Sequence, residues 1–301
     1  MKLSIIIATH ARPDSLARLL ASLAPQMHRS RCELIVAENG TVGGPTRVPG
    51  DFALSAHIYD ERPGKCRVQN MAIKRATGDV LIFLDDDLVV CRDYVDQVER
   101  FFTYRTEFAA MKGRILPRED PHKIAGINWV YLDLPLVDHG DEIIEVRGVI
   151  GANMAFLAGA IRAVGPFDER LGPGAAGHEE ETEMSTRLRR AGYHIGYSPN
   201  AIVYHDVDPA RADRTRFIRV ARERGRCRMI HETHSRFDVN LKNAVASARL
   251  AIASTLRVSA ERRAREERRL AVARGMLDAL NAVELPADAR VRANDDPLPR
   301  T

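Results

Sequence analysis

A run of five apolar residues, 80–84, followed at once by Asp85, Asp86 and Asp87, constrains the fold more than any other segment of the chain. Such a run predicts a strand that is buried on both faces, as in the centre of a parallel sheet. Ligands bind beyond the carboxyl ends of the strands in sheets of this kind. Side-chain alternation predicts Asp85 and Asp87 on one side of the strand and Asp86 on the other.

Carboxylates held on the same side of a strand repel each other unless a cation lies between them. Mn²⁺ and Mg²⁺ both suit carboxylate oxygens together with a diphosphate. The three aspartates therefore predict a divalent-metal site at the end of this strand. The alternative is a solvated acidic turn that caps the following helix.

Strands and helices alternate through residues 1–113. The expected strands are 3–8, 33–37, 57–59 and 80–84, and the expected helices begin near residue 14 and span 66–76 and 93–104. Each of the first three strands ends in a polar loop that carries Gly or Pro. This order is typical of right-handed crossovers, so we predict an α/β fold with a doubly wound, mostly parallel sheet of the Rossmann-like kind.

The pattern is looser after residue 113. Residues 114–147 lack clear periodicity and are interpreted as a substrate loop or lid, before strands over 149–156 and 201–204. Helical composition dominates 211–283, where an apolar stripe runs at helical spacing through Leu241, Val245, Ala248, Ile252 and Leu256. From residue 284 to 301 a disordered tail is expected.

Charge is distributed unevenly along the 301 residues. Residues 1–210 hold 24 Lys and Arg against 29 Asp and Glu, whereas residues 211–274 hold 18 against 7, a net charge of +11. The basic segment predicts a possible peripheral contact with an anionic membrane surface, and the alternative is a solvated helical face. No apolar stretch reaches the roughly 20 residues that a bilayer requires, so we expect a cytoplasmic protein, peripheral to the inner face of the membrane if that contact forms.

A second acidic cluster, 179–183, follows a glycine-rich segment and begins a helix. Glu181 lies three residues before Met184 on the predicted buried stripe, so it is expected to point inward as a general base, with Glu180 off that stripe. Favourable placement of acids at a helix N-terminus is the alternative explanation. His205 closes the strand 201–204 and is either a metal ligand or a structural residue.

Taken together, these segments resemble the inverting family-2 glycosyltransferases of the GT-A fold. The resemblance is carried by residues 4–13, 78–87, 151–156, 164–172 and 180–184, and it extends over about residues 1–208. It implies a catalytic domain over 1–210, with a nucleotide-binding half over about 1–113 and an acceptor half over about 114–210. The basic helices of 211–283 would then be an appended region.

The resemblance also implies roles for individual residues. Glu181 would be the base, with Glu180 as the second catalytic candidate, and Asp87, Asp85 and His205 would hold Mn²⁺ or Mg²⁺. The residues that would bind the nucleotide sugar are Thr9, Arg12, Glu38, Lys65, Asp85 and Asp86. The expected donor is a UDP-, GDP- or dTDP-linked sugar. The expected acceptor is a glycan, a lipid-linked saccharide or a secondary metabolite.

Two functions other than glycosyl transfer are compatible with parts of the sequence. A nucleotidyltransferase that makes nucleotide sugars also needs metal-binding carboxylates, but it ordinarily has a glycine-rich loop after its first strand, and residues 8–12 contain no glycine. A nucleic-acid-binding protein would use the arginine-rich helices. The scarcity of aromatic residues among those arginines and the acidic first 210 residues argue against nucleic acid as a partner.

Overall fold

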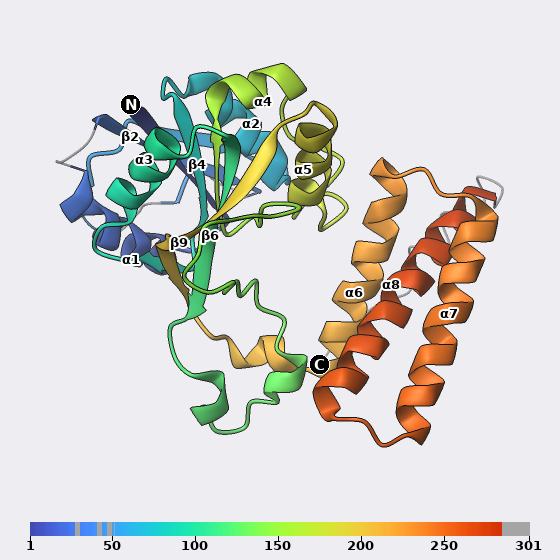
Figure 1. Ribbon diagram of the computed structural model, residues 1–301. Helices are drawn as coiled ribbons and strands as arrows, with labels where there is room; N and C mark the ends of the chain where they lie inside the picture. Colours follow the sequence, from blue (N-terminus) through green and yellow to red (C-terminus); the bar gives the residue numbers. More distant parts are fainter. Residues whose placement is uncertain (28–30, 41–43, 47–49, 51, 285–301) are drawn as a thin grey trace. The chain divides into compact units, whose positions relative to one another are not determined.

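The computed structural model describes residues 1–27, 31–40, 44–46, 50 and 52–284, and Figure 1 shows the course of the chain. The chain divides into two compact units. Unit 1 comprises Met1–Ile127 and Asp133–Pro209, and unit 2 comprises Asn128–Leu132 and Ala210–Thr301. Apart from Glu284, the tail predicted over 284–301 lies outside the described residues.

Unit 1 is built on a sheet that has nine strands within the described residues. They are β1 (Lys2–Thr9), β2 (Arg31–Asn39), β3 (Ala56–Asp60), β4 (Val80–Asp85), β5 (Leu88–Val90), β6 (Phe108–Pro117), β7 (Ile144–Glu145), β8 (Asn153–Leu157) and β9 (His194–His205). The order is β3-β2-β1-β4-β8-β6-β9-β5, with β7 paired to β9. Neighbours among β3, β2, β1 and β4 are parallel, as are β6 and β9, whereas β8 runs antiparallel between β4 and β6. The predicted α/β fold is confirmed.

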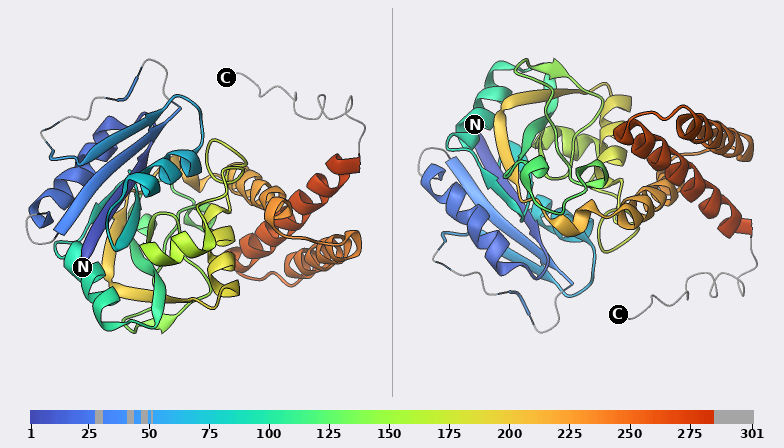
Figure 2. Two further views of the ribbon diagram at one scale, coloured as in Figure 1. Left: turned by 90° about the horizontal axis from the view of Figure 1, so that it is seen from above. Right: turned by 90° about the horizontal axis from the view of Figure 1, so that it is seen from below.

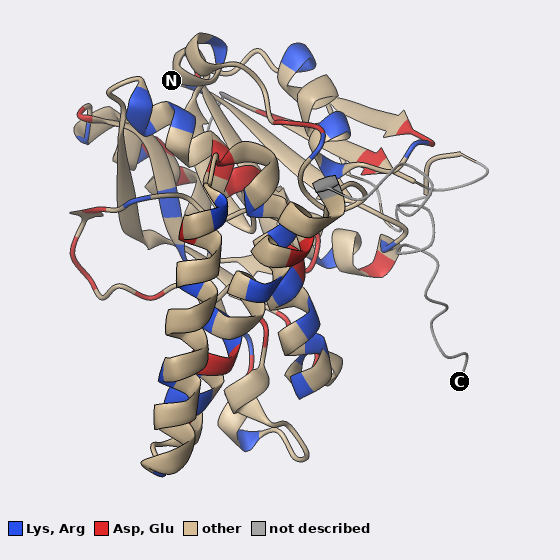
Figure 3. Cartoon of the chain, turned by 90° about the vertical axis from the view of Figure 1, so that its right-hand side faces the viewer, with Lys and Arg blue, Asp and Glu red and all other residues tan. Residues whose placement is uncertain are grey.

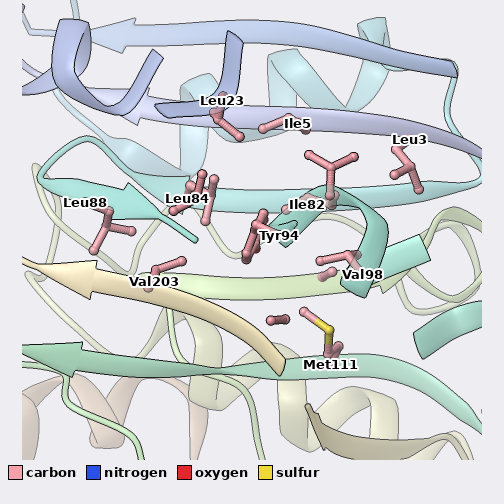
Figure 4. Close-up of a cluster of buried hydrophobic side chains, with 14 of the residues drawn as sticks. Leu3, Ile5, Leu23, Ile82, Leu84, Leu88, Tyr94, Val98, Met111 and Val203 are labelled. Atoms are coloured by element: carbon pink, nitrogen blue, oxygen red, sulfur yellow. The ribbon is translucent and has the colours of Figure 1, made fainter. Parts of the chain in front are cut away.

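Helices cover both faces of this sheet, as Figure 2 shows. They are α1 (Pro13–Leu23), α2 (Lys65–Arg75), α3 (Tyr94–Tyr104), α4 (Ala158–Val164) and α5 (Glu180–Arg190), with the 3-10 helix η1 (Ala24–Gln26) after α1. Ile5 and Ile7 of β1 belong to the core under α1 and α3, and Ile6 belongs to the core under α2, α4 and α5. Figure 4 shows the first core, with Leu23 of α1 and Tyr94 of α3 among the strand residues.

The second half of unit 1 is more regular than predicted. The region predicted as an irregular loop contains the end of β6, β7 and two 3-10 helices, η2 (Pro121–Lys123) and η3 (Trp129–Tyr131), of which η3 belongs to unit 2. The strand predicted over 149–156 begins only at Asn153, and the strand predicted over 201–204 is the last part of β9. β6 was not predicted from the sequence because charged residues interrupt its apolar pattern. One of them, Arg114, is bonded at 2.8 Å to both Asp138 and Asp141.

Unit 2 consists mainly of three helices, α6 (Arg214–His231), α7 (Arg236–Thr255) and α8 (Ala260–Glu284), with η4 (Pro209–Ala212) at its start. α8 packs against both other helices and lies between them in Figure 1. α6 and α8 meet at two glycines: a Cβ on Gly225 would overlap the carbonyl oxygen of Val272, and one on Gly275 would overlap that of Arg222. The predicted helical C-terminal region is confirmed. None of the helices formed by the described residues is both long and apolar enough to cross a membrane.

Candidate active site

Several of the predicted site residues lie at one edge of the sheet, where the parallel strands end. Thr9 at the end of β1 is the register partner of Glu38 in β2, and Ala8 is the partner of Asp85 at the end of β4. Because parallel strands end at the same edge, their last side chains are brought together although they are up to 76 residues apart in the sequence. The predicted donor side of the site is therefore assembled by β1, β2 and β4.

The three aspartates do not follow the predicted alternation. β4 ends at Asp85, and the two following residues form a turn in which Asp86 and Asp87 both contact Arg12, at 3.2 and 3.3 Å. Asp86 is buried and accepts a hydrogen bond of 2.7 Å from the hydroxyl of Thr9. Burial raises the pKa of Asp86, while the Thr9 hydroxyl and the Arg12 guanidinium oppose that shift. Alternation failed because it holds only within a strand.

Lys65 connects the donor side of the site to the second acidic cluster. Its ammonium lies 2.6 Å from Asp85 Oδ1 and 3.9 Å from Glu180 Oε1. Burial would lower the pKa of Lys65, but the carboxylates of Asp85 and Glu180 outweigh this effect and raise the pKa overall. Lys65 is therefore a permanently charged bridge between two carboxylates from distant parts of the chain.

A glycine-rich loop places α5 beside Lys65. The backbone N–H of Lys65 donates a 2.8 Å hydrogen bond to the carbonyl of Pro173. At Gly174, where φ is +83°, a Cβ would overlap the backbone of Gly64, so only glycine allows the loop to approach the start of α2 this closely. At Gly172 a Cβ would come within 3.2 Å of the Glu180 carboxyl carbon. The loop thus fixes the first turn of α5 against α2.

The structure corrects the predicted orientation of the two glutamates. Glu180 is buried on the same face as Met184 and Leu188, whereas Glu181 is only partly buried. Burial, followed by the charge of Glu181, raises the pKa of Glu180 well above its usual value, although Lys65 opposes the shift. The prediction was wrong because the residues three and four positions before Met184 both lie on its helix face. Spacing alone therefore could not choose between Glu181 and Glu180.

His205 and Asp87 form the part of the site that fits a metal ion. His205 is buried, and its Nδ1 lies 2.7 Å from the carbonyl oxygen of Asp206, which assigns the ring proton to Nδ1. Nε2 of the same ring lies 3.4 Å from Asp87 Oδ1. A backbone carbonyl that holds one ring nitrogen is the usual support of a metal-ligating histidine. Among the described residues, no cluster of three or more His, Cys, Asp or Glu side chains is arranged as a metal site.

Glu38 is buried in a polar pocket next to Thr9. Its carboxylate accepts hydrogen bonds from the backbone N–H of Thr46 at 2.8 Å and from the Thr46 hydroxyl, and it lies 3.1 Å from His57 Nε2. Sequence reasoning missed both partners. His57 could have been found from the sequence. Tyr59 is the register partner of Glu38, and His57, two residues before Tyr59, lies on the same face of the sheet as Glu38.

The comparisons with known proteins agree with this architecture. Residues 4–130 match glycosyl transferase family 2. The glucosyl-dolichyl phosphate glucuronosyltransferase of Haloferax volcanii is 24% identical over 219 residues, which cover 69% of this chain and 70% of that protein. The succinoglycan biosynthesis protein ExoM of Rhizobium meliloti is 29% identical over 232 residues, which cover 70% of this chain and 69% of ExoM.

A solved structure extends the likeness to the whole fold. The mannosyltransferase PcManGT from Pyrobaculum calidifontis, in complex with GDP-Man and Mn²⁺, superposes with a TM-score of 0.54 at 17% identity, covering 97% of this chain and 79% of that one. The fold, the strand-end carboxylates and the sequence match define a GT-A protein. The family match over residues 4–130, the glycosyltransferase relatives and the fold together support a family-2 glycosyltransferase.

Proposed function

We propose that this protein transfers a sugar from a nucleotide-sugar donor to a hydroxyl group, with inversion at the anomeric carbon. The observation that carries the proposal is the bridge formed by Lys65, which joins Asp85 at the end of β4 to Glu180 at the start of α5. A strand-end carboxylate on the donor side and a helical carboxylate pair on the acceptor side are thereby held at one site. The acceptor is a glycan, a lipid-linked saccharide or a secondary metabolite.

The donor is proposed to bind along the ends of β1, β2 and β4. Thr9, Arg12 and Glu38 line the nucleotide pocket, and Asp85 lies near the donor ribose. The 51% exposed side chain of Arg12 is the accessible cation of this group, so it suits an anionic nucleotide of the UDP, GDP or dTDP type. Thr9 positions Asp86, which holds Arg12 in turn.

Asp87 and His205 are proposed to hold Mn²⁺ or Mg²⁺ together with Asp85, the third predicted ligand, which lies 2.6 Å from the Lys65 ammonium. The fit rests on the carboxylate oxygen of Asp87 and the imidazole nitrogen of His205, which lie 3.4 Å apart. When bound, the ion supplies positive charge against the diphosphate leaving group. The structure of PcManGT in complex with GDP-Man and Mn²⁺ supports the pairing of metal and nucleotide sugar in this fold.

Glu181 is proposed as the general base. Its partial exposure suits a group that must reach an acceptor hydroxyl, whereas Glu180 is buried against Lys65. Glu181 would take the proton from the hydroxyl as the oxygen attacks the anomeric carbon from the face opposite the leaving group. Glu180 is then a positioning residue that holds Lys65, and through it Asp85.

The acceptor half and the basic helices complete the proposal. Residues 114–210 are proposed to bind the acceptor. The basic region 211–274, with a net charge of +11, is proposed to contact an anionic membrane surface, where lipid-linked acceptors are found.

The proposal is tested by thermal unfolding with Mn²⁺ and a panel of UDP, GDP, dTDP and CDP. We expect one nucleotide to raise the melting temperature only when the metal is present, because binding to the folded state stabilises it. Asp87→Ala should abolish this increase, whereas Asp141→Ala, which removes an exposed carboxylate elsewhere, should keep it. The absence of any shift in the wild type, or an undiminished shift in Asp87→Ala, would refute the assignment.

A further inference from the structure

Most large apolar side chains of α7 lie on its solvent-exposed side, whereas Leu250 of the same helix packs against the small cluster of Ala246, Leu270 and Ala273. Five large apolar side chains are between 47% and 74% exposed: Phe237, Leu241, Val245, Ile252 and Leu256. The buried positions of the helix are instead Val239, Ala246 and Ala253. At 100° per residue, the five exposed side chains fall within an arc of about 100° over about 28 Å of helix axis. These five residues are called the apolar row.

A basic groove borders the apolar row. It has a volume of about 510 Å³, lies among α6, α7 and α8, and shares Val245 with the row. Its basic lining residues are Arg228, Lys242, Arg249, Arg265, Arg268 and Arg269. Among the described residues that line it, Glu232 is the acidic one, and Val272 and Met276 contribute apolar surface. Figure 3 shows the blue bands of basic residues along the helices of unit 2.

The chemistry of row and groove selects among possible occupants. A second copy of the chain pairing through the row would bring two basic grooves together, and like charges repel. The chain's own segment 285–301 has only Leu285, Val291 and Leu298 as large apolar residues and equal numbers of acidic and basic residues, so it matches neither surface. Nucleic acid would need stacking aromatics, and the row contains Phe237 alone. An anionic lipid leaflet matches both surfaces, because it offers acyl chains beside phosphates.

We propose that α7 lies in the interface of an anionic phospholipid leaflet, with the apolar row among the acyl chains and the groove's basic side chains on lipid phosphates. This inference deepens the membrane contact proposed above and rests on that proposal, but it does not depend on the transfer chemistry. A surface helix of this composition binds through buried apolar area and electrostatic attraction together. Both contributions can therefore be removed separately.

The experiment measures sedimentation of the full chain with phosphatidylcholine vesicles and with vesicles that also contain phosphatidylglycerol. We expect binding to the anionic vesicles that weakens with salt. Leu241→Ser/Ile252→Ser should weaken it by about tenfold or more, because two large side chains no longer enter the leaflet. The matched control is Met71→Ser/Tyr104→Ser, which removes two exposed apolar side chains from unit 1 and should bind like the wild type.

A second pair of variants tests the basic groove. Lys242→Gln/Arg265→Gln should weaken binding to anionic vesicles and flatten its salt dependence, whereas Lys74→Gln/Arg75→Gln, on exposed positions of α2, should change neither. Wild-type protein that fails to bind anionic vesicles at low salt overturns the inference, as does a row variant that binds like its control. A dimer in sedimentation velocity that the row variant disperses, without vesicle binding, overturns it in favour of a second copy. Nucleotide-dependent melting of the same proteins keeps a failure here distinct from a failure of the proposed transfer.

Discussion

Replacing Lys65 with methionine should destabilise unit 1 strongly and in a pH-dependent way. The Lys65 side chain is 12% exposed and its ammonium lies 2.6 Å from Asp85 and 3.9 Å from Glu180, so its removal leaves two carboxylates without their cation. Removing one partner of a buried charge pair lowers the free energy of unfolding by about 3–5 kcal/mol. Because Asp85 remains 29% exposed, we expect the lower end, about 3 kcal/mol at pH 7.5, or about 6–12 °C in melting temperature.

The pH dependence follows from Glu180. Its folded-state pKa is already raised, mainly by burial, and loss of Lys65 raises that pKa further. A carboxyl with a raised pKa contributes stability that is present below its unfolded pKa of about 4.3 and is lost as the pH rises through its folded pKa. The loss of unfolding free energy caused by Lys65→Met should therefore be smaller at pH 5 than at pH 7.5.

Urea unfolding followed by circular dichroism at the two pH values measures this deficit. Lys74→Met removes an exposed lysine from the same helix and should change the free energy of unfolding by no more than about 0.5 kcal/mol. A Lys65→Met variant as stable as Lys74→Met would refute the bridge. A deficit that is equal at pH 5 and pH 7.5 would refute the role given to Glu180.

Three further substitutions test the site and the fold. Glu181→Gln should lower kcat by about 10²–10⁴-fold while leaving donor affinity unchanged in calorimetry, and an unchanged kcat would exclude Glu181 as the base. Tyr94→Phe removes the 2.7 Å hydrogen bond to Asn153 Oδ1 and should cost about 1–3 kcal/mol in urea unfolding, against almost nothing for the exposed Tyr104. Gly225→Ala forces α6 off α8 and should cost about 1–3 kcal/mol, whereas Gly159→Ala, which meets no atom within 4 Å, should be neutral or stabilising.

The residues at the edge of the sheet were predictable from the sequence because each strand end is marked by the residues next to it. An apolar run that ends in carboxylates marks a buried strand end, and the parallel register of β1, β2 and β4 then brings Thr9, Glu38 and Asp85 together. The bridge through Lys65 was not predictable in this way. It depends on the approach of the loop around Gly174 to the start of α2, and neither segment carries a periodic signal.

Helical spacing defines a stripe of residues but not whether that stripe is buried, and this explains the error at the start of α5. Met184 shares its helix face with Glu180 as readily as with Glu181, and packing against α2 decided for Glu180. The apolar stripe on α7 has the predicted spacing, yet the helix buries Val239, Ala246 and Ala253 and leaves the stripe exposed. Which residues of a helix are buried depends on the surface that packs against it, and the sequence of the helix alone does not determine this.

The charge balance of the site argues for a cation that acts together with the donor. The carboxylates of 85–87, Glu180 and Glu181 outnumber the basic side chains that contact them, which are Arg12, Lys65 and His205. Burial relieves part of this excess by raising the pKa values of Asp86 and Glu180. A nucleoside diphosphate would add negative charge at the same edge, which is unfavourable without a counter-ion. Because Lys65 and Arg12 are each held by two carboxylates, the ion proposed at Asp87 and His205 would supply the charge that balances the diphosphate.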